Sequence, residues 1–389
     1  MSATHASMRT AIHKIVSALI PFDRLEEEHL DFAKQWIASG AEIFRLKAPD
    51  QPPIHLVSYF MVIDQHTNQL LLVDHKKAQH WLPPGGHVEL NEHPKETVKR
   101  EAWEELGIEA DFLLEDPLFL TVRNTVGTCA SHTDVSLWYV LKGNAKASLN
   151  YDTAEFQQIR WFKQSEIPFE QSDPNLQRFL DKALKKLVTL NSYDVSASQY
   201  ELNTEALHPQ KEVQKFLEML PSRKAKILDI GCGPGRDAKI FVEHGLDVIG
   251  IDFSSKMVEI ARKNVPQGTF QLMDIESLVF LAGTFDGAWA NCSLLHIPKK
   301  NMPLILKNIW TILKSNGCLY ISLKQDRLDE LCTPDGRYGG LEKFWSFYEE
   351  NDLMTLLNES GFKIIDIEIA NPTVNYQTHP LIKILAKKQ

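Results

Sequence analysis

Hydrophobic and polar positions in the first half of the chain follow two different periods. Apolar residues recur at helical spacing through residues 1–50, as at Phe32 and Trp36, which predicts a helical lead-in. Short apolar runs then predict strands at residues 56–63, 69–73, 135–141 and 158–162. A helix is expected between them at residues 94–106, because that segment begins at a proline and stops before a glycine. An amphipathic helix at residues 174–190 closes this half.

The later part of the chain alternates between short apolar runs and helical patterns. Strands are expected at residues 227–230, 248–251, 269–273, 287–290 and 318–323, with helices between them. Two further strands, 363–369 and 382–386, are expected to form an antiparallel edge. This alternation is typical of a parallel doubly wound sheet. We therefore expect two α/β domains, residues 1–190 and 191–389, joined near Asn191 without a Gly/Ser-rich linker.

Composition and charge narrow the classes of partner. The 389 residues are 43% hydrophobic and 24% charged, as in ordinary globular proteins. Residues 1–190 hold 20 Lys+Arg against 26 Asp+Glu, and the remainder 22 against 25, so neither half has the basic excess of a nucleic-acid-binding protein. No apolar run is long enough to span a bilayer, and the five cysteines are widely spaced. We expect a cytoplasmic protein with small-molecule partners and neither a membrane nor a nucleic acid as partner.

Acidic residues cluster on the helix expected at residues 94–106. Glu101, Glu104 and Glu105 are spaced i, i+3, i+4, so they share one side of that helix. Like charges at this spacing destabilise an isolated helix, whereas a hard cation such as magnesium requires clustered carboxylate oxygens. The preceding Pro-Pro-Gly-Gly segment, residues 83–86, is a tight loop from which a backbone carbonyl could join the metal shell. The alternative is a solvated acidic helix face.

The segment from Gly86 to Ile108 resembles the Nudix box, and every specified position matches. Chance agreement at seven fixed residue types is on the order of one in 10⁸ per starting position. The resemblance implies a Nudix α/β/α sandwich over about residues 50–190 that hydrolyses a nucleoside diphosphate linked to another group. The box alone leaves the identity of that group open.

The Nudix resemblance also implies roles for individual residues. Metal ligands for Mg²⁺ or Mn²⁺ would be Glu101, Glu104 and Glu105, assisted by the carbonyl of Gly85, and the catalytic set would add Arg100 and Glu92, paired to hold the loop against the helix. The general base would be Glu101 or a carboxylate outside the box such as Glu155. Two roles stay open for His75, Trp81 and His132: contact with the substrate, or an ordinary structural role.

A glycine-rich turn follows the first strand of the second half. Gly231, Gly233 and Gly235 allow a sharp turn and close approach of a ligand to the backbone. The next strand ends in Asp252, which is placed to accept hydrogen bonds from both ribose hydroxyls of a cofactor. Asp274 follows the third strand and could accept an adenine amino group. A nicotinamide-binding enzyme would share the glycine loop, but this order of acidic residues favours S-adenosylmethionine.

Residues 192–389 resemble class I methyltransferases, of the branch that acts on small molecules. The resemblance implies a Rossmann-like doubly wound fold that binds S-adenosylmethionine. Its cofactor-binding residues would be Tyr200, Asp229, Gly231, Gly233, Gly235, Asp252, Phe253, Asp274, Ile275 and Asn291. The family places residues 291–296 beside the methyl donor. There Cys292 is expected to pack, with a nucleophilic cysteine as the alternative, and His296 to act as a base or to face solvent. The Asn-Pro-Pro-Tyr motif of amino-group nucleic-acid methyltransferases is absent from the sequence.

Glycines and aromatic residues gather at residues 333–348, beyond the fourth strand. This composition suits a lid that closes over a compact methyl acceptor, although the aromatics could instead begin a core-packed helix. The leading hypothesis is a bifunctional enzyme acting on a nucleoside diphosphate derivative and on a small-molecule methyl acceptor. Two alternatives are a nucleotide-sensing Nudix-like domain that regulates a methyltransferase, and an enzyme that hydrolyses and methylates RNA ends.

Overall fold

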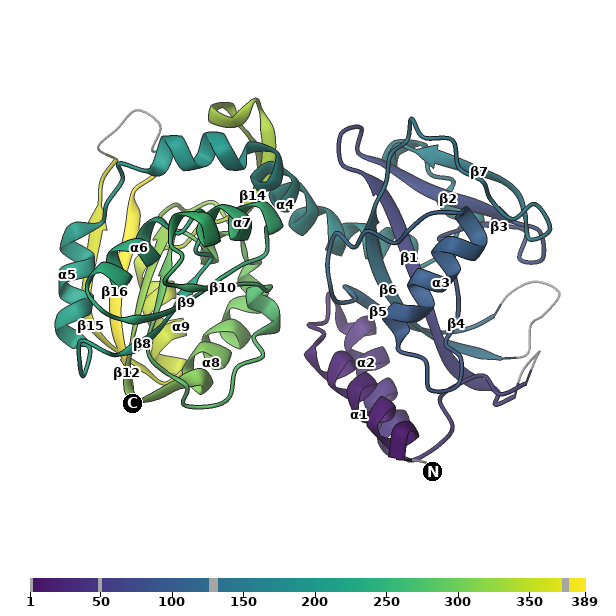
Figure 1. Cartoon of the computed structure of the whole chain (residues 1–389), viewed down its shortest axis with the longest axis horizontal. Helices are drawn as coiled ribbons and strands as arrows, with labels where there is room; N and C mark the ends of the chain where they lie inside the picture. The colour runs from purple at the N-terminus through teal and green to yellow at the C-terminus, as the bar shows by residue number, and fades with distance from the viewer. Residues whose placement is uncertain (1–2, 48–50, 126–131, 373–377) are drawn as a thin grey trace. The chain divides into compact units, whose positions relative to one another are not determined.

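The computed structural model describes residues 3–47, 51–125, 132–372 and 378–389, which form two compact units (Figure 1). Unit 1 comprises Met1–Ala183 and unit 2 comprises Leu184–Gln389. One long helix, α4 (Leu176–Thr204), contains the boundary between them, and the boundary expected near Asn191 also lies in this helix.

Unit 1 consists of helices and a mixed β-sheet. Its helices are α1 (Ala3–Ala18), α2 (Arg24–Ala38), α3 (Pro94–Leu106), the start of α4, and the 3₁₀ turns η1 (Gln164–Glu166) and η2 (Phe169–Gln171). Its strands are β1 (Ile54–Asp64), β2 (Gln69–His75), β3 (His80–Leu82), β4 (Gly85–His87), β5 (Phe119–Asn124), β6 (Thr133–Lys142) and β7 (Phe156–Phe162). The strand order is β3-β2-β1-β6-β5, with β4 also paired to β1 and β7 to β2. Only the β1–β6 pair is parallel among these pairings.

The sheet of unit 1 is covered on both faces. Leu56 and Phe60 of β1 belong to a buried apolar cluster with residues of α1, α2 and α3. On the opposite face, Trp138 of β6 stacks on Phe179 of α4 with ring centroids 5.1 Å apart. Since successive residues of a strand point to opposite faces, this alternation produces an α/β/α sandwich.

The Nudix-box helix α3 has the expected bounds and clear end signals. His93 caps its N-terminus by accepting a hydrogen bond from the Lys95 amide, and Pro94 occupies the first turn. Gly107 ends the helix in the left-handed conformation, with φ of 64°. Val98 and Ala102 are fully buried, so one side of α3 is fixed in the core while its acidic side is left for other contacts.

Unit 2 is a doubly wound sheet with an added hairpin. Its helices are the rest of α4, α5 (Gln210–Met219), α6 (Arg236–Glu243), α7 (Ser255–Asn264), α8 (Met302–Ile312), α9 (Glu350–Glu359), and the 3₁₀ turns η3 (Ile275–Ser277), η4 (Leu294–His296), η5 (Lys299–Asn301) and η6 (Gly336–Tyr338). Its strands are β8 (Lys226–Ile230), β9 (Asp247–Asp252), β10 (Thr269–Leu272), β11 (Phe285–Asn291), β12 (Leu313–Lys324), β13 (Glu330–Asp335), β14 (Leu341–Ser346), β15 (Phe362–Ala370) and β16 (Leu381–Lys388).

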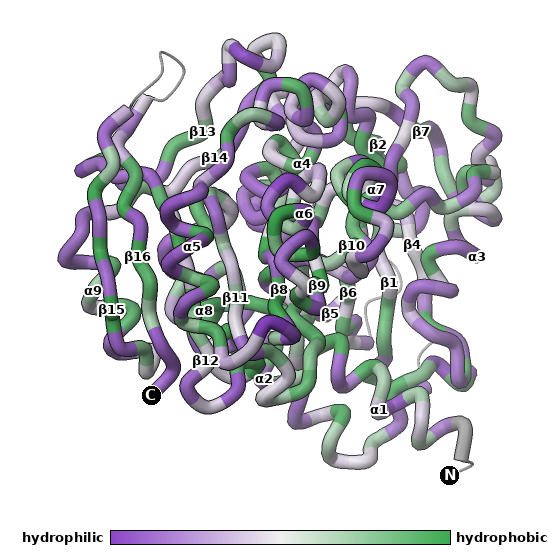
Figure 2. Tube along the Cα trace, turned by 60° about the vertical axis from the view of Figure 1, so that its left-hand side comes forward, coloured by the Kyte–Doolittle hydropathy of each residue, from purple (hydrophilic) through white to green (hydrophobic). Residues whose placement is uncertain are grey.

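The strand order of the large sheet is β10-β9-β8-β11-β12-β16-β15. Strands β8 to β12 are parallel, and β16 is antiparallel to both of its neighbours, β12 and β15. Hydrophobic positions run along these strands in Figure 2. Side chains of α5, α6 and α7 share one core cluster on the sheet, which leaves the other face to α8 and α9. The order reverses at β8, and ligands of such sheets bind at the carboxyl ends of the strands there.

Most strands expected from the sequence are confirmed, while several elements differ. Strands β3, β4 and β5 were not expected; the first two are three residues long and too short for a periodic signal. The helix expected to end at residue 190 continues to Thr204, because no glycine or proline occurs before Pro209. Residues 1–2 and 48–50 of the expected helical lead-in lie outside the described residues.

Residues 333–348, expected as a lid or as the start of a helix, form neither an open aromatic surface nor a helix. Strands β13 and β14 pair as an antiparallel hairpin around η6. Its aromatic side chains and those just after it are buried: Tyr338, Phe344, Trp345, Phe347 and Tyr348. β-branched and aromatic residues with turn glycines favour a hairpin, and burial accounts for the aromatic content.

Two further observations concern membrane spans and cysteines. None of the helices in the described part combines the length and hydropathy that a membrane span requires. The four cysteines among the described residues carry free thiols, and Cys129 lies outside them.

Candidate active sites

The acidic side of α3 faces the glycine loop that precedes it. A methyl group added at Gly86 would lie 1.9 Å from Oε1 of Glu101, so only a glycine allows the backbone of β4 and this carboxylate to come so close. Glu105 approaches the same loop, because its Oε2 accepts a hydrogen bond of 2.9 Å from the Gly85 amide. Glu104 is the exposed member of the three.

Burial and mutual repulsion act on these carboxylates together. Burial raises the pKa of Glu105 well above its usual range, and the nearby charges of Glu101 and Glu155 raise it further. Burial also raises the pKa of Glu101, against the lowering effect of Arg100. The ionised forms of these carboxylates are therefore stabilised too little by their own partners.

Arg100 links the loop and the helix. Its guanidinium donates to both oxygens of Glu92, at 3.0 and 3.1 Å, and also to the carbonyl of His87. The same group donates to Glu101 at 2.6 Å and to Glu104 at 3.3 Å. Such a bidentate, charge-assisted pair fixes both the position and the orientation of the arginine.

Three other residues considered from the sequence, His75, Glu155 and Trp81, have defined contacts in unit 1. Glu155 pairs with His75, whose Nε2 lies 3.2 Å from Oε1, and this hydrogen bond lowers the pKa of Glu155. Trp81 packs edge-to-face on Phe162 at 4.9 Å, as a structural residue would.

In unit 2, the glycine loop turns between β8 and α6 as expected. Gly231, Gly233 and Gly235 all have positive φ, of 69°, 53° and 84°. A methyl group at Gly231 would lie 2.4 Å from Cβ of Ser293, so this position requires glycine for space as well as for conformation. The loop amides of Gly231 and Cys232 both donate to the carbonyl of Ile251, which ties the loop to β9.

Asp252 at the end of β9 is the buried carboxylate of this loop. Its oxygens accept hydrogen bonds from the amides of Gly233 and Ser254, both at 2.9 Å. Burial raises the pKa of Asp252 to about 6, although these two amides act to lower it. Asp229 at the end of β8 is equally buried, and burial together with the charge of Asp237 raises its pKa.

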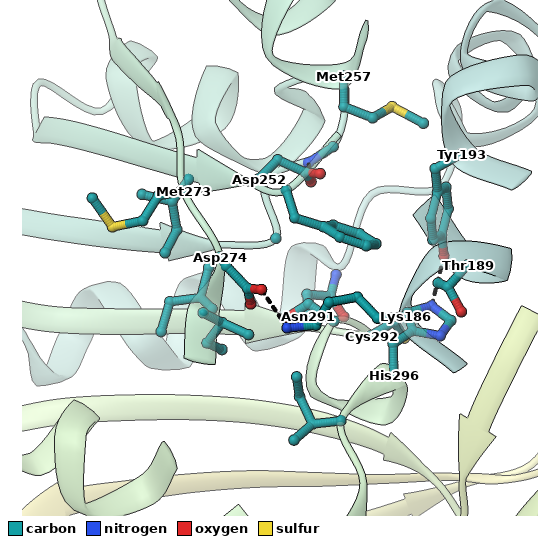
Figure 3. A pocket seen from close by; sticks show the side chains of 18 of the residues that line it. Lys186, Thr189, Tyr193, Asp252, Met257, Met273, Asp274, Asn291, Cys292 and His296 are labelled. Atoms are coloured by element: carbon teal, nitrogen blue, oxygen red, sulfur yellow. Dashed lines mark hydrogen bonds and ion pairs between the residues drawn. The ribbon is translucent and has the colours of Figure 1, made fainter. Parts of the chain in front are cut away.

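A lysine that was not expected at the site reaches Asp274. Lys186 of α4 forms ion pairs with Asp274 and with Glu276, and Figure 3 shows the first of these across the pocket. Burial alone would lower the pKa of Lys186, but the two carboxylates outweigh it and raise the pKa. No sequence motif marks Lys186, because it lies far from Asp274 along the chain and on a helix assigned to the other half.

Asn291 and Asp237 belong to one hydrogen-bond network behind the loop. The Asn291 amide donates to Asp237 at 2.8 Å, and the hydroxyl of Ser322 donates to the Asn291 oxygen at 2.7 Å. Asp237 also accepts from the indole of Trp289 and pairs with Arg236. Both ends of the Asn291 amide are thus fixed, which orients its side chain at the pocket wall.

His296 and Tyr193 form the side of the pocket nearest the hairpin. The tyrosine hydroxyl lies 2.7 Å from Nε2 of His296 (Figure 3). Nδ1 of His296 lies 2.7 Å from the carbonyl of Phe344. Burial lowers the pKa of His296 to about 3, so the ring is neutral, and its Nδ1–H donates to Phe344. His296 therefore does not face solvent. Burial also raises the pKa of Cys292, so its thiol stays protonated.

The pocket in unit 2 gathers most of the expected cofactor residues. Its empty volume is about 770 Å³, counting space open to solvent. Eight of the ten expected residues line it: Tyr200, Gly231, Gly233, Asp252, Phe253, Asp274, Ile275 and Asn291. Asp229 and Gly235 are not among the lining residues, whereas Lys186, Thr189 and Met257 are lining residues that sequence reasoning missed.

Family profiles match a segment of each unit. The NUDIX domain profile matches residues 54–183, which contain α3 and its glycine loop, and the methyltransferase domain profile matches residues 227–317, which contain the pocket loop. The chain joins a Nudix domain to a methyltransferase domain. The methyltransferase family supports S-adenosylmethionine as the cofactor of unit 2.

Curated relatives match part of the chain. An O-methyltransferase of Penicillium expansum is 32% identical over 163 residues, which are 39% of this chain and 56% of that protein. An O-methyltransferase of Aspergillus nomiae is 31% identical over 37% of this chain and 67% of its own length. The wheat phosphoethanolamine N-methyltransferase is 30% identical over 42% of this chain and 32% of its own length. The chain thus spans about a third to two thirds of the length of these relatives.

Among solved structures, a methyltransferase of Methanosarcina mazei is 22% identical with a TM-score of 0.42, covering 46% of this chain and 97% of that one. The 1,6-didemethyltoxoflavin-N1-methyltransferase of Burkholderia thailandensis is 20% identical with a TM-score of 0.43, covering 53% of this chain and 90% of that one.

Proposed function

We propose that the chain is a bifunctional enzyme. The Nudix domain would hydrolyse a nucleoside diphosphate-linked substrate with Mg²⁺ or Mn²⁺, and the methyltransferase domain would transfer the methyl group of S-adenosylmethionine to a small molecule. The observation that carries the first activity is the approach of Glu101 and Glu105 to the Gly85–Gly86 loop. A domain that only senses nucleotides would not need these carboxylates to converge.

The chemistry of the carboxylate cluster fits a divalent cation. Glu105 is buried beside like charges, and Glu101 stands against the loop, so a bound cation would relieve the repulsion between them. Glu101, Glu104 and Glu105 would hold the metal, assisted by the Gly85 carbonyl. When bound, it would supply charge neutralisation of the pyrophosphate and activation of a water molecule.

The remaining residues of the Nudix box position this cluster. Glu92 holds Arg100 at two points, and Arg100 in turn donates to His87 and to Glu101. This chain of contacts fixes the loop against α3 and orients the Glu101 carboxylate. Two carboxylates remain for the general base, Glu101 at the loop and Glu155 beside His75.

In the methyltransferase domain, Asp252 would accept the ribose hydroxyls while the glycine loop carries the methionine part of the cofactor. Asp274 and Ile275 would contact the adenine, and the adenine amino group would then share Asp274 with Lys186. Asp229 and Gly235, which do not line the pocket, would support the loop from behind, and Tyr200, Phe253 and Asn291 would complete the walls.

Several contacts of the hairpin support a small methyl acceptor. The Phe344 amide of β14 donates to Thr189 of α4 at 2.9 Å, and Lys185 of α4 pairs with Glu330 of β13. The hairpin is thus fastened through Phe344 to Thr189 and His296, two residues that line the pocket. His296 is neutral and already accepts from Tyr193, so this wall would position the acceptor and exclude water.

The hydrolase activity can be tested with the full chain and a panel of nucleotide sugars, dinucleotides and nucleoside diphosphates. With Mg²⁺ or Mn²⁺ present, one class should release phosphate or nucleoside monophosphate, and Glu104→Gln should cut turnover about 100-fold or more. Glu96→Gln, an exposed acid on the same helix, is the matched control and should keep wild-type turnover. Equal turnover of Glu104→Gln and wild type would show that the metal assignment is wrong.

The methyl acceptor can be tested by competition. Labelled S-adenosylmethionine is offered together with tRNA, single-stranded RNA, DNA and a small-molecule metabolite fraction. We expect the label in the small-molecule fraction. Saturable labelling of purified nucleic acid, with none in the small molecules, would instead favour an RNA-processing enzyme.

A further inference from the structure

Four polar side chains with no assigned role in the Nudix carboxylate site meet at one end of the unit 1 sheet. His55 lies near the start of β1, His87 ends β4, and His132 and Asp134 lie just before and at the start of β6. The residues come from three places in the sequence but from adjacent strands, because β1 pairs with both β4 and β6. His55 and Asp134 are direct partners in the β1–β6 register, so their side chains emerge side by side.

The ligand-type atoms of this group are close together. Oδ1 of Asp134 lies 3.3 Å from Nε2 of His132, 3.5 Å from Nε2 of His55 and 3.9 Å from Nε2 of His87. One potential ligand atom from each residue lies within 4.8 Å of all the others. Four ligands about 2.0–2.2 Å from a tetrahedral metal stand roughly 3.4 Å apart, so the pairs at 3.3 and 3.5 Å already match, and the widest pairs would contract by roughly 1.4 Å or less.

The orientation of His55 is also that of a metal ligand. Its Nδ1 lies 2.9 Å from the carbonyl of Pro52, an acceptor only, so Nδ1 carries a proton and Nε2 is the ring atom that faces Asp134 in the cluster. Metal-bound histidines usually donate their other ring N–H to a carbonyl or carboxylate in this way. His55 is fully buried and His132 nearly so, while His87 and Asp134 keep partial exposure through which an ion could enter.

The cluster is separate from the acidic side of α3. A methyl group at Gly86 would point at Glu101, and His87 is the next residue of β4, so its side chain points to the opposite face. Ser58 of β1, paired with Gly86, donates to the Pro94 carbonyl of α3, which places α3 on the Gly86 side. His55 differs from Ser58 by an odd number of positions and therefore faces the other way.

We propose that His55, His87, His132 and Asp134 form a second metal site of the Nudix domain, for a zinc-class transition metal. Three imidazoles and one carboxylate suit Zn²⁺ far better than Mg²⁺, which prefers oxygen ligands alone. Four protein ligands fill a tetrahedral shell, so the site is structural: it fastens β4, which carries the Nudix loop, to β1 and β6.

The test uses the full chain, stripped with a chelator and titrated with Zn²⁺ against a chromophoric chelator. Wild type should bind one Zn²⁺ tightly and melt at a higher temperature when loaded. His132→Gln and Asp134→Asn should each weaken this binding about 100-fold or more, because each removes a ligand. Glu104→Gln, in the carboxylate cluster, and His66→Gln, an exposed histidine of the same domain, should bind Zn²⁺ as wild type does.

Co²⁺ provides a second measurement on the unchanged chain, in case the variants do not fold. Four-coordinate Co²⁺ with nitrogen and oxygen ligands has intense visible bands, whereas six-coordinate Co²⁺ has weak ones. Intense bands that Zn²⁺ displaces are expected. Weak bands only, or Zn²⁺ binding that is lost in Glu104→Gln and kept in His132→Gln, would overturn the proposal.

Discussion

Replacing Asp252 with asparagine separates cofactor binding from the stability of the fold. Asp252 accepts hydrogen bonds from the amides of Gly233 and Ser254, and the proposal assigns it both ribose hydroxyls of S-adenosylmethionine. Asparagine has the same shape but no charge, and one of its two terminal atoms is a donor. The ribose therefore loses a charged acceptor, and one backbone amide faces an NH₂ group.

Two opposing effects set the change in the free energy of unfolding. Burial raises the pKa of Asp252 from 3.8 to about 6, so ionising it in the folded protein costs about 3 kcal/mol at neutral pH. Asparagine removes that cost but leaves an amide poorly paired, which costs roughly 1–3 kcal/mol. The two nearly cancel. Loss of hydrogen bonds to a charged group, roughly 1.5–3 kcal/mol, should meanwhile weaken S-adenosylmethionine binding about 10- to 100-fold.

The raised pKa also fixes the sign of the pH dependence. The neutral carboxyl is the form that the folded protein favours, so the contribution of Asp252 to stability is full below pH 3.8 and is lost as pH rises to about 6. Cofactor binding has the opposite dependence, because the ionised form accepts both hydroxyls. Wild-type affinity should fall as pH drops below about 6, and Asp252→Asn should lack this step.

Calorimetric titration of the full chain with S-adenosylmethionine between pH 5 and pH 8 measures the affinity for the cofactor. A thermal melt under the same conditions measures the stability of the fold. Asp247→Asn, an exposed acid at the other end of β9, is the control and should bind as wild type does. If Asp252→Asn binds within about twofold of wild type at pH 7.5, or if its loss of affinity is matched by a collapse of the melting temperature, the reasoning fails.

Two further predictions concern packing around the two sites, and a third concerns a buried ion pair in unit 1. Gly86→Ala should lower Nudix turnover by about 100-fold with little change in melting temperature, since its methyl group would displace the Glu101 carboxylate by more than an ångström; a thermal melt beside the turnover assay checks this. Gly231→Ala should abolish most S-adenosylmethionine binding in calorimetry, because it forces both a clash with Ser293 and a strained φ. Lys182→Met should lower the free energy of unfolding in urea by about 3 kcal/mol at pH 8, and by less at pH 5, where the buried Glu26 partner can take up a proton.

Local sequence carried most of the information about the two ligand loops. The Nudix box and the glycine loop are contiguous segments whose chemistry depends on neighbouring residues, so helix α3 and the turn at Gly231–Gly235 could be predicted in detail. Asp252 and Asp274 could also be found, because each follows directly on a predictable strand. Periodicity in the strands was sufficient to predict a doubly wound sheet.

Contacts between distant segments could not be predicted in the same way. Lys186 meets Asp274 only because α4 continues past residue 190, and the sequence pattern there gives no reason to connect the two. The approach of His55 to His132 depends on the β1–β6 register, which one sequence without pairing information does not specify. The hairpin β13–β14 was missed because buried aromatics look alike in a strand, a helix or a lid.

Helix α4 has a consequence for how the gene can be divided. Arg178 and Lys182 on its first turns bind Asp23 and Glu26 in unit 1, whereas Lys186 and Tyr193, one to three turns later, belong to the pocket of unit 2. A fragment of the methyltransferase that began at residue 192 would lack Lys186, and a Nudix fragment ended early would lose the partner of Glu26. Recombination that exchanges either domain for a homologue must therefore preserve the contacts of this helix with both units. Breakpoints inside the helix are expected to be selected against.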